Sequence, residues 1–204
     1  ARGIGPIYPV RAYDATGNPI LTPTGEHFYD YGVHPGAVNR PGGASPGRHV
    51  VYETLLNDVF SKRVAVNART FAEIKFLKDF TFRPSVNIDL RQSNGTSYQN
   101  AIVGDGAGSN GTSSINTSLT TSYTFNQVLS YNKSFGSHTI NVLAGHENYD
   151  LNFKTNSAFK VNQILAGNTN FANFVTPQNA GGFTDTYRIE SYFSKASYNF
   201  NEKY

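Results

Sequence analysis

Cysteine, methionine and tryptophan are absent from this 204-residue sequence, and charged residues make up only 15% of it. The lack of cysteine excludes disulfide frameworks, zinc–cysteine sites, iron–sulfur clusters and thiol catalysis. No run approaches 18 apolar residues, so the sequence predicts no transmembrane helix. Lysine and arginine form no cluster, which argues against a nucleic-acid partner. Because methionine is missing, we expect a processed chain or an internal piece of a longer protein.

The residues that are abundant favour strands and turns. Phenylalanine and tyrosine supply an aromatic content of 14%, and 19 glycines and 22 asparagines accompany them. Aromatic residues are enriched in strands, and glycine and asparagine in turns, whereas long windows of helix formers are scarce. The sequence therefore predicts an all-β fold and argues strongly against an all-α one.

The first 60 residues differ in character from the rest. Residues 1–60 are rich in glycine and proline and predict irregular structure with short hairpins. We expect a short strand over 8–13, turns over 14–19 and 22–25, and a long loop over 31–48.

Five segments after residue 60 alternate apolar and polar residues with a period of two, which is typical of half-buried strands. They cover 64–76, 80–91, 119–131, 139–153 and 187–200. Pro84 lacks an N–H group for the sheet and predicts a bulge. In the fourth segment the apolar positions change parity after Ala144, which indicates either a bulge or a strand that leaves its buried zone.

Short and long connections alternate between these segments. Short turns are expected at 77–79, 132–138 and 201–203, and long loops at about 93–117 and 155–184. A strand of 13 residues is about 43 Å long and spans about 30 Å when tilted by 45°, which is the thickness of a bilayer core.

Aromatic residues flank the short turns, as in the girdles of outer-membrane barrels. They are Phe76, Phe80, Tyr131, Phe135, Phe200 and Tyr204. We therefore predict an antiparallel transmembrane β-barrel segment of about five long strands, with short periplasmic turns and long extracellular loops. Because closed membrane barrels need about eight strands or more, the remainder of the same barrel must come from other material. A soluble or cell-surface β-rich binding or adhesion module stays open as an alternative.

Several short segments follow one another along the chain in a distinctive order: the YPV of 8–10, 73–80 (EIKFLKDF), 123–127 (YTFNQ) with 133–136 (KSFG), 141–147 (NVLAGHE) and 187–194 (YRIESYFS). In wording and order these segments resemble the SusC/RagA family of TonB-dependent outer-membrane transporters. The resemblance covers most of 60–204 and, more loosely, the preceding loop. Lys195 stands where the family usually has arginine.

The resemblance implies a 22-stranded barrel in the bacterial outer membrane of Bacteroidota-type organisms. It implies energised import of oligosaccharides or peptides, a SusD-like surface lipoprotein as lid, and contact with TonB through a plug domain. The plug domain is not part of this sequence. On this interpretation residues 1–60 form an extracellular loop region, and 61–204 form barrel wall that meets outer-membrane lipid.

No catalytic or cofactor-binding constellation emerges from the residues, so we expect no enzyme. The sequence 106–111 matches G-x-G-x-x-G but lacks the following helix and acidic residue of a dinucleotide site. Acidic and histidine residues at 26–34 lie in a loop without metal-site spacing, and a structural calcium ion is conceivable there but not indicated. His146 and Glu147 lack a nucleophile elbow to complete a triad.

The polar faces of the predicted strands supply the candidate site. In a barrel these faces line the lumen, where they bind the plug, water or substrate. The candidates are Asn87, Asp89, Arg91, Asn126 and Glu147.

Overall fold

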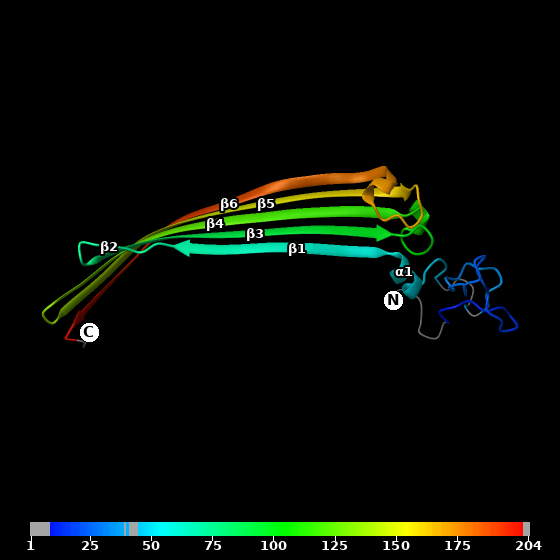
Figure 1. Ribbon diagram of the computed structural model, residues 1–204, viewed down its shortest axis with the longest axis horizontal. Helices are drawn as coiled ribbons and strands as arrows, with labels where there is room; N and C mark the ends of the chain where they lie inside the picture. The colour runs from blue at the N-terminus through cyan, green and yellow to red at the C-terminus, as the bar shows by residue number, and fades with distance from the viewer. Residues whose placement is uncertain (1–8, 39, 41–44, 202–204) are drawn as a thin grey trace. The chain divides into compact units, whose positions relative to one another are not determined.

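The computed structural model describes residues 9–38, 40 and 45–201, and strands dominate it (Figure 1). The elements among these residues are α1 (Val50–Leu56), β1 (Asp58–Phe71), β2 (Ile74–Phe76), β3 (Phe80–Gln99), the 3-10 turn η1 (Ala107–Ser109), β4 (Thr112–Phe135), β5 (His138–Gln163), the 3-10 turn η2 (Phe171–Asn173) and β6 (Phe174–Phe200). In the part of the chain described, every helix is too short or too polar to cross a membrane.

The strands pair in the order β1-β3-β4-β5-β6, with β2 also paired to β3, and Figure 1 shows them side by side. Each strand follows its neighbour through a hairpin connection, so the sheet is antiparallel, and the prediction of an all-β antiparallel fold is confirmed.

Proline interrupts the first edge of this sheet. The expected strand over 64–76 is divided into β1 and β2, and the gap between them lies opposite Pro84. Ala72 N donates to Pro84 O at 3.0 Å, but Pro84 has no N–H group to return the bond. The irregularity predicted at Pro84 therefore takes the form of a break in the partner strand.

The strands are longer than the alternation predicted, so the expected long loops are wrong in extent. β3 continues to Gln99 and β4 begins at Thr112, which leaves 100–111 as the connection instead of 93–117. β5 and β6 likewise leave only 164–173 between them, instead of 155–184. These strand ends are rich in serine, threonine and asparagine, and this composition predicted loops. Strands whose two faces both contact water carry the same residues.

The short turns are tight. Leu77 and Lys78 both have positive φ values at the first turn, and the second turn contains only two residues, with Gly136 at φ +59°. Of the third predicted turn Asn201 is described, with φ +53°; the rest of it and Tyr204 lie outside the described residues.

The first 60 residues hold two predicted turns and one element that the sequence did not reveal. Gly17 and Gly25 take φ +84° in the turns expected over 14–19 and 22–25. The strand expected over 8–13 is reduced to isolated bridges at Arg11 and Tyr13, and Tyr8 lies outside the described residues. Helix α1 was not predicted.

The chain divides into two compact units. The first contains the residues up to Ser61 together with Asn94–Asn116 and Ser157–Gly181, and the second contains Lys62–Ser93, Thr117–Asn156 and the residues from Gly182 onward. The second unit therefore consists of the sheet sections next to the short turns.

The change of parity in β5 is not caused by a bulge. Ser134 pairs with Thr139, Asn126 with Glu147, and Thr117 with the backbone O of Asn156. The steps between these pairs contain equal numbers of residues on β4 and β5, whereas a bulge would add one residue to one strand. β5 is continuous, and its apolar side chains change from one face of the strand to the other along its length.

Candidate functional site

One face of the second unit carries a concave polar site. The cavity has a volume of about 300 Å3, and its lining side chains come from β1, β3, β4 and β5: Arg69, Ser85, Asn87, Thr124, Asn126 and Glu147. Asn126 Nδ2 donates to Glu147 Oε2 at 2.9 Å, which holds the carboxylate against the sheet. Arg69 and Glu147 lie three strand spacings apart, or about 14 Å at about 4.8 Å per strand. The site thus places opposite charges at the two ends of a row of amide and hydroxyl groups.

A second polar group lies beside this cavity on β1 and β3. Asp89 Oδ1 is 3.1 Å from Arg91 Nε, and Asn67 Nδ2 donates to Asp89 Oδ2 at 3.1 Å. The guanidinium of Arg83 lies 4.3 Å from the ring centroid of Phe71 on the same pair of strands. Since Arg91 is exposed, this ion pair contributes little to the stability of the fold.

The five predicted site residues divide between these two groups. Asn87, Asn126 and Glu147 line the cavity, and Asp89 pairs with Arg91. Sequence reasoning missed the other lining residues, which are Arg69, Ser85 and Thr124, because only the register of the neighbouring strands brings them to one site. Alternation marked Arg69 as polar, but no sequence signal gives the pairing that brings it opposite Asn87.

The opposite face is apolar near the short turns. Aromatic rings lie there in contact across neighbouring strands: Phe76 with Phe80 at 5.5 Å between centroids, Phe80 with Tyr131 at 4.8 Å, and His138 with Phe135 at 5.4 Å and with Phe200 at 5.0 Å. Many apolar side chains on this face are exposed, for example Val66 and Tyr198 at 52% and 53%. A face of this kind needs a cover that the described residues do not supply.

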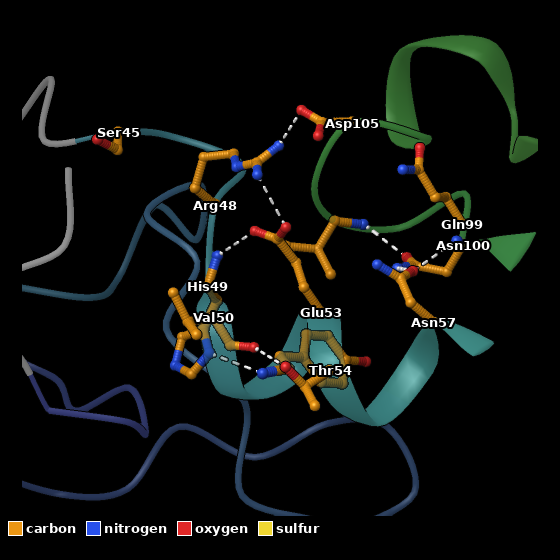
Figure 2. Close-up of polar contacts among 12 residues, drawn as sticks. Ser45, Arg48, His49, Val50, Glu53, Thr54, Asn57, Gln99, Asn100 and Asp105 are labelled. Carbon is orange, nitrogen blue, oxygen red and sulfur yellow. Dashed lines mark hydrogen bonds and ion pairs between the residues drawn. The ribbon is translucent and has the colours of Figure 1, made fainter. Parts of the chain in front are cut away.

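The first unit is organised by a polar network around α1 (Figure 2). His49 caps the helix, because its Nδ1 accepts from Tyr52 N at 2.9 Å, and Glu53 Oε1 accepts from His49 N at 2.9 Å. Arg48 bridges Glu53, at 3.0 Å, and Asp105 on the connection after β3.

A second link joins the same two segments. Asn57 Oδ1 accepts from the backbone N of Asn100 at 2.9 Å and from its side chain at 2.6 Å. The network around α1 is thus a structural clamp that connects the helix to the 100–111 connection (Figure 2).

Features that suggested other chemistry have structural roles. His146 pairs with Glu190 at 3.0 Å on one face of the sheet, while Glu147 bonds to Asn126 on the other, so the two do not form a dyad. The glycine-rich run 106–111 contains η1 and leads directly into β4, not into a helix. Within the described ranges 9–38, 40 and 45–201, no three histidine or acidic side chains are close enough to hold a metal ion.

The loop residues at 26–34 instead serve the backbone. His27 Nε2 lies 2.8 Å from Ala12 O, and His34 Nδ1 accepts from Gly36 N at 3.2 Å. Asp30 Oδ1 accepts from Gly32 N at 3.0 Å.

Comparison with protein families and with curated sequences gives no match. Solved structures do match. A chain of the RagAB peptide transporter superposes with a TM-score of 0.68 at 18% identity, over 88% of this chain and 20% of its own length. Chains of the RagAB peptide importer in its open-open and closed-closed states superpose with TM-scores of 0.63, at 18% and 17% identity, over 94% and 99% of this chain.

At this level of identity, these matches show a similar fold. The chain spans about a fifth of the length of the solved chains that it matches. The resemblance to the SusC/RagA family that the sequence motifs indicated is confirmed at the level of the fold.

Proposed function

We propose that the chain is a stretch of barrel wall from an outer-membrane, TonB-dependent importer of the SusC/RagA type. Residues 61–204 cross and rise above the membrane, and residues 1–60 together with the two long connections lie outside the cell. The whole transporter imports peptides or oligosaccharides with a SusD-like lipoprotein as lid. The plug domain that contacts TonB belongs to the rest of the transporter.

The observation that carries this proposal is the two-faced sheet. One face holds the polar cavity, and the other holds exposed aliphatic residues with an aromatic band at the short turns. A barrel places lipid against an apolar face with such a band and water against a polar face. The strands, of up to 27 residues, exceed the 9–11 that cross a bilayer.

In this role the chain acts without chemistry of its own. Its apolar face excludes lipid from the path, and its polar face offers hydrogen-bonding groups to water, plug and substrate in turn. The hydrogen bond from Asn126 holds the Glu147 side chain in place on this polar face. The work of import comes from TonB acting on the plug.

Membrane fractionation followed by intact mass and peptide mapping tests the proposal. We expect peptides that extend past both ends of this sequence, in an outer-membrane species of about 100 kDa or more. A species close to 22.4 kDa that stays folded in water without detergent would contradict the proposal and favour the surface-module alternative.

A further inference from the structure

A second polar cavity lies in the first unit, where β1, β3 and β4 meet the 164–173 connection. Its volume is about 170 Å3, which is below the about 300–1,000 Å3 of pockets for drug-sized ligands. The cavity therefore holds a single ring-sized group. Its principal lining side chains come from the three strands and the connection: Asp58, Thr96, Tyr98, Ser113, Asn170 and Phe171.

The wall that the 164–173 connection supplies is held in place from two sides. Asn173 is only 6% exposed, and its side chain forms three hydrogen bonds of 2.8–2.9 Å with the backbone of the same connection. Phe174, which is 1% exposed, packs edge-on against Tyr98, with 6.0 Å between the ring centroids. The wall is thus ordered before a ligand binds, which lowers the entropy cost of binding.

The polar side chains of the cavity are free to bind a ligand. No described residue forms a hydrogen bond or ion pair with the side chains of Asp58, Thr96 or Ser113. Ser113 is only 3% exposed, and the buried hydroxyl groups of proteins are almost always paired. A polar ligand in the cavity would supply the hydrogen bond that this hydroxyl lacks.

The groups around the cavity match the two kinds of surface on a sugar ring. A pyranose has hydroxyl groups around its edge and C–H groups on its faces. The carboxylate of Asp58 and the hydroxyl of Ser113 bind hydroxyl groups, and the ring of Phe171 offers an apolar surface to the C–H groups. Lys160 Nζ lies 4.8 Å from the centroid of the Phe171 ring without lining the cavity, so it supports that ring from outside.

Ions fit the same cavity less well. An anion such as phosphate would lie against the carboxylate of Asp58, and among the described residues that line the cavity none is lysine or arginine. A calcium ion takes about six to eight oxygen ligands and favours several carboxylates, whereas the lining supplies only that of Asp58.

The cavity does not belong to the polar site of the second unit. Thr96 and Tyr98 stand at even-numbered positions of β3, as Ile88 and Leu90 do, whereas Asn87 stands at an odd-numbered position. Successive side chains of a strand point to opposite faces, so Thr96 and Tyr98 belong to the face opposite Asn87. A ligand in this cavity therefore lies off the path that the proposed function gives to the imported substrate.

We propose that this cavity is a binding site for one sugar ring of a cell-surface glycan. The ring comes either from a free saccharide or from the headgroup of a membrane glycolipid, and both sources present the same chemistry. This role goes beyond the proposed function, because it concerns the side of the wall that faces away from the import path.

Hydrogen exchange of the full-length protein tests the proposal. In detergent, the probes are glucose, galactose, mannose and N-acetylglucosamine. In phosphatidylethanolamine vesicles, the probe is purified lipopolysaccharide, and vesicles without it are the blank. We expect at least one sugar, free or within lipopolysaccharide, to slow amide exchange at residues 168–171 about 10-fold when its concentration is about ten times its Kd.

Two variants test whether the lining residues carry this binding. Asp58→Asn keeps the size of the side chain, and Phe171→Ala removes the apolar wall; each should weaken binding at least about 10-fold. Leu165→Ala is the matched control, because the Leu165 side chain is 61% exposed on the same connection and does not line the cavity. The control should bind as the unchanged protein does.

The outcomes separate the sources and the alternatives. Protection by lipopolysaccharide alone would support the proposal with a glycolipid as the source, and protection by free sugars would support it with a free saccharide. Absence of protection by every sugar would overturn it, and so would equal protection by the blank vesicles or equal weakening in the Leu165→Ala variant. Import, measured separately on the same protein, tests the proposed function.

Discussion

β6 passes so close to β5 at Gly182 that no side chain fits there. A Cβ atom added at Gly182 would lie 2.5 Å from the backbone O of Thr155 and 2.6 Å from Oδ1 of Asn156. The neighbouring Gly181 has nothing within 4 Å of the same position. Two adjacent glycines of one strand thus form a matched pair for substitution by alanine.

The two substitutions should change stability in opposite directions. Alanine at either position lowers the freedom of the unfolded chain and stabilises by about 0.4–1 kcal/mol. At Gly182 this gain is exceeded by overpacking against backbone, which costs about 1–3 kcal/mol. We expect Gly182→Ala to destabilise the β5–β6 pairing by about 1–2 kcal/mol and Gly181→Ala to stabilise it slightly.

Hydrogen exchange of the full-length protein measures the effect locally. A loss of 1–2 kcal/mol corresponds to a roughly 5–30-fold faster exchange of amides that open with this pairing. We expect this acceleration at residues 153–157 in the Gly182→Ala variant and none in the Gly181→Ala variant. Equal exchange in the two variants would refute the close approach on which the reasoning depends.

Three further predictions concern charged groups. The Glu147→Ala substitution should reduce uptake of substrate, because Asn126 loses its hydrogen-bond acceptor. The Glu147→Gln substitution keeps an acceptor and should change the free energy of unfolding, measured by thermal unfolding, by no more than about 0.5 kcal/mol. Arg48→Ala should speed amide exchange in α1 by no more than about 5-fold, since partly exposed ion pairs contribute about 0–1 kcal/mol; a larger change would show that the clamp is cooperative. Hydrogen bonds from the Thr16 side chain and from the backbone N of Asn18 hold the pKa of Asp14 below its ordinary value. Because the pKa of Asp14 is lower in the folded state, the turn should keep its stability at neutral pH and lose it as the pH falls through the folded-state pKa of Asp14. The Asp14→Asn substitution should remove this pH dependence, measured as the protection of the Asn18 amide from exchange.

The alternation of side chains was enough to predict the sheet, because each strand beside a short turn has one apolar and one polar face. It was not enough to predict where the strands end. At Gln99 and Thr112, for example, strand residues have the composition of a loop, and only pairing with a neighbouring strand shows that they are extended. Helix α1 was not predicted, because its N-cap residue is a histidine, which is not a typical N-cap residue.

The sequence predicted several residues of the candidate site but not which residues come together in it. Asn87, Asn126 and Glu147 were identified from the polar faces, but their meeting with Arg69 depends on the register of four strands. The change of parity after Ala144 was visible in the sequence, but only the cross-strand pairs show that no bulge causes it.

The central claim is that this sheet is a membrane wall with its polar face toward the path of the substrate. Asn87 and Ile88 are neighbours on opposite faces of β3, and the environment-sensitive dye bimane can be attached to a single cysteine at either position in the full-length protein in lipid vesicles. We predict that brominated lipids quench bimane at position 88 and not at 87, and that a water-soluble quencher does the reverse. Similar quenching at both positions, or the opposite pattern, would contradict the account.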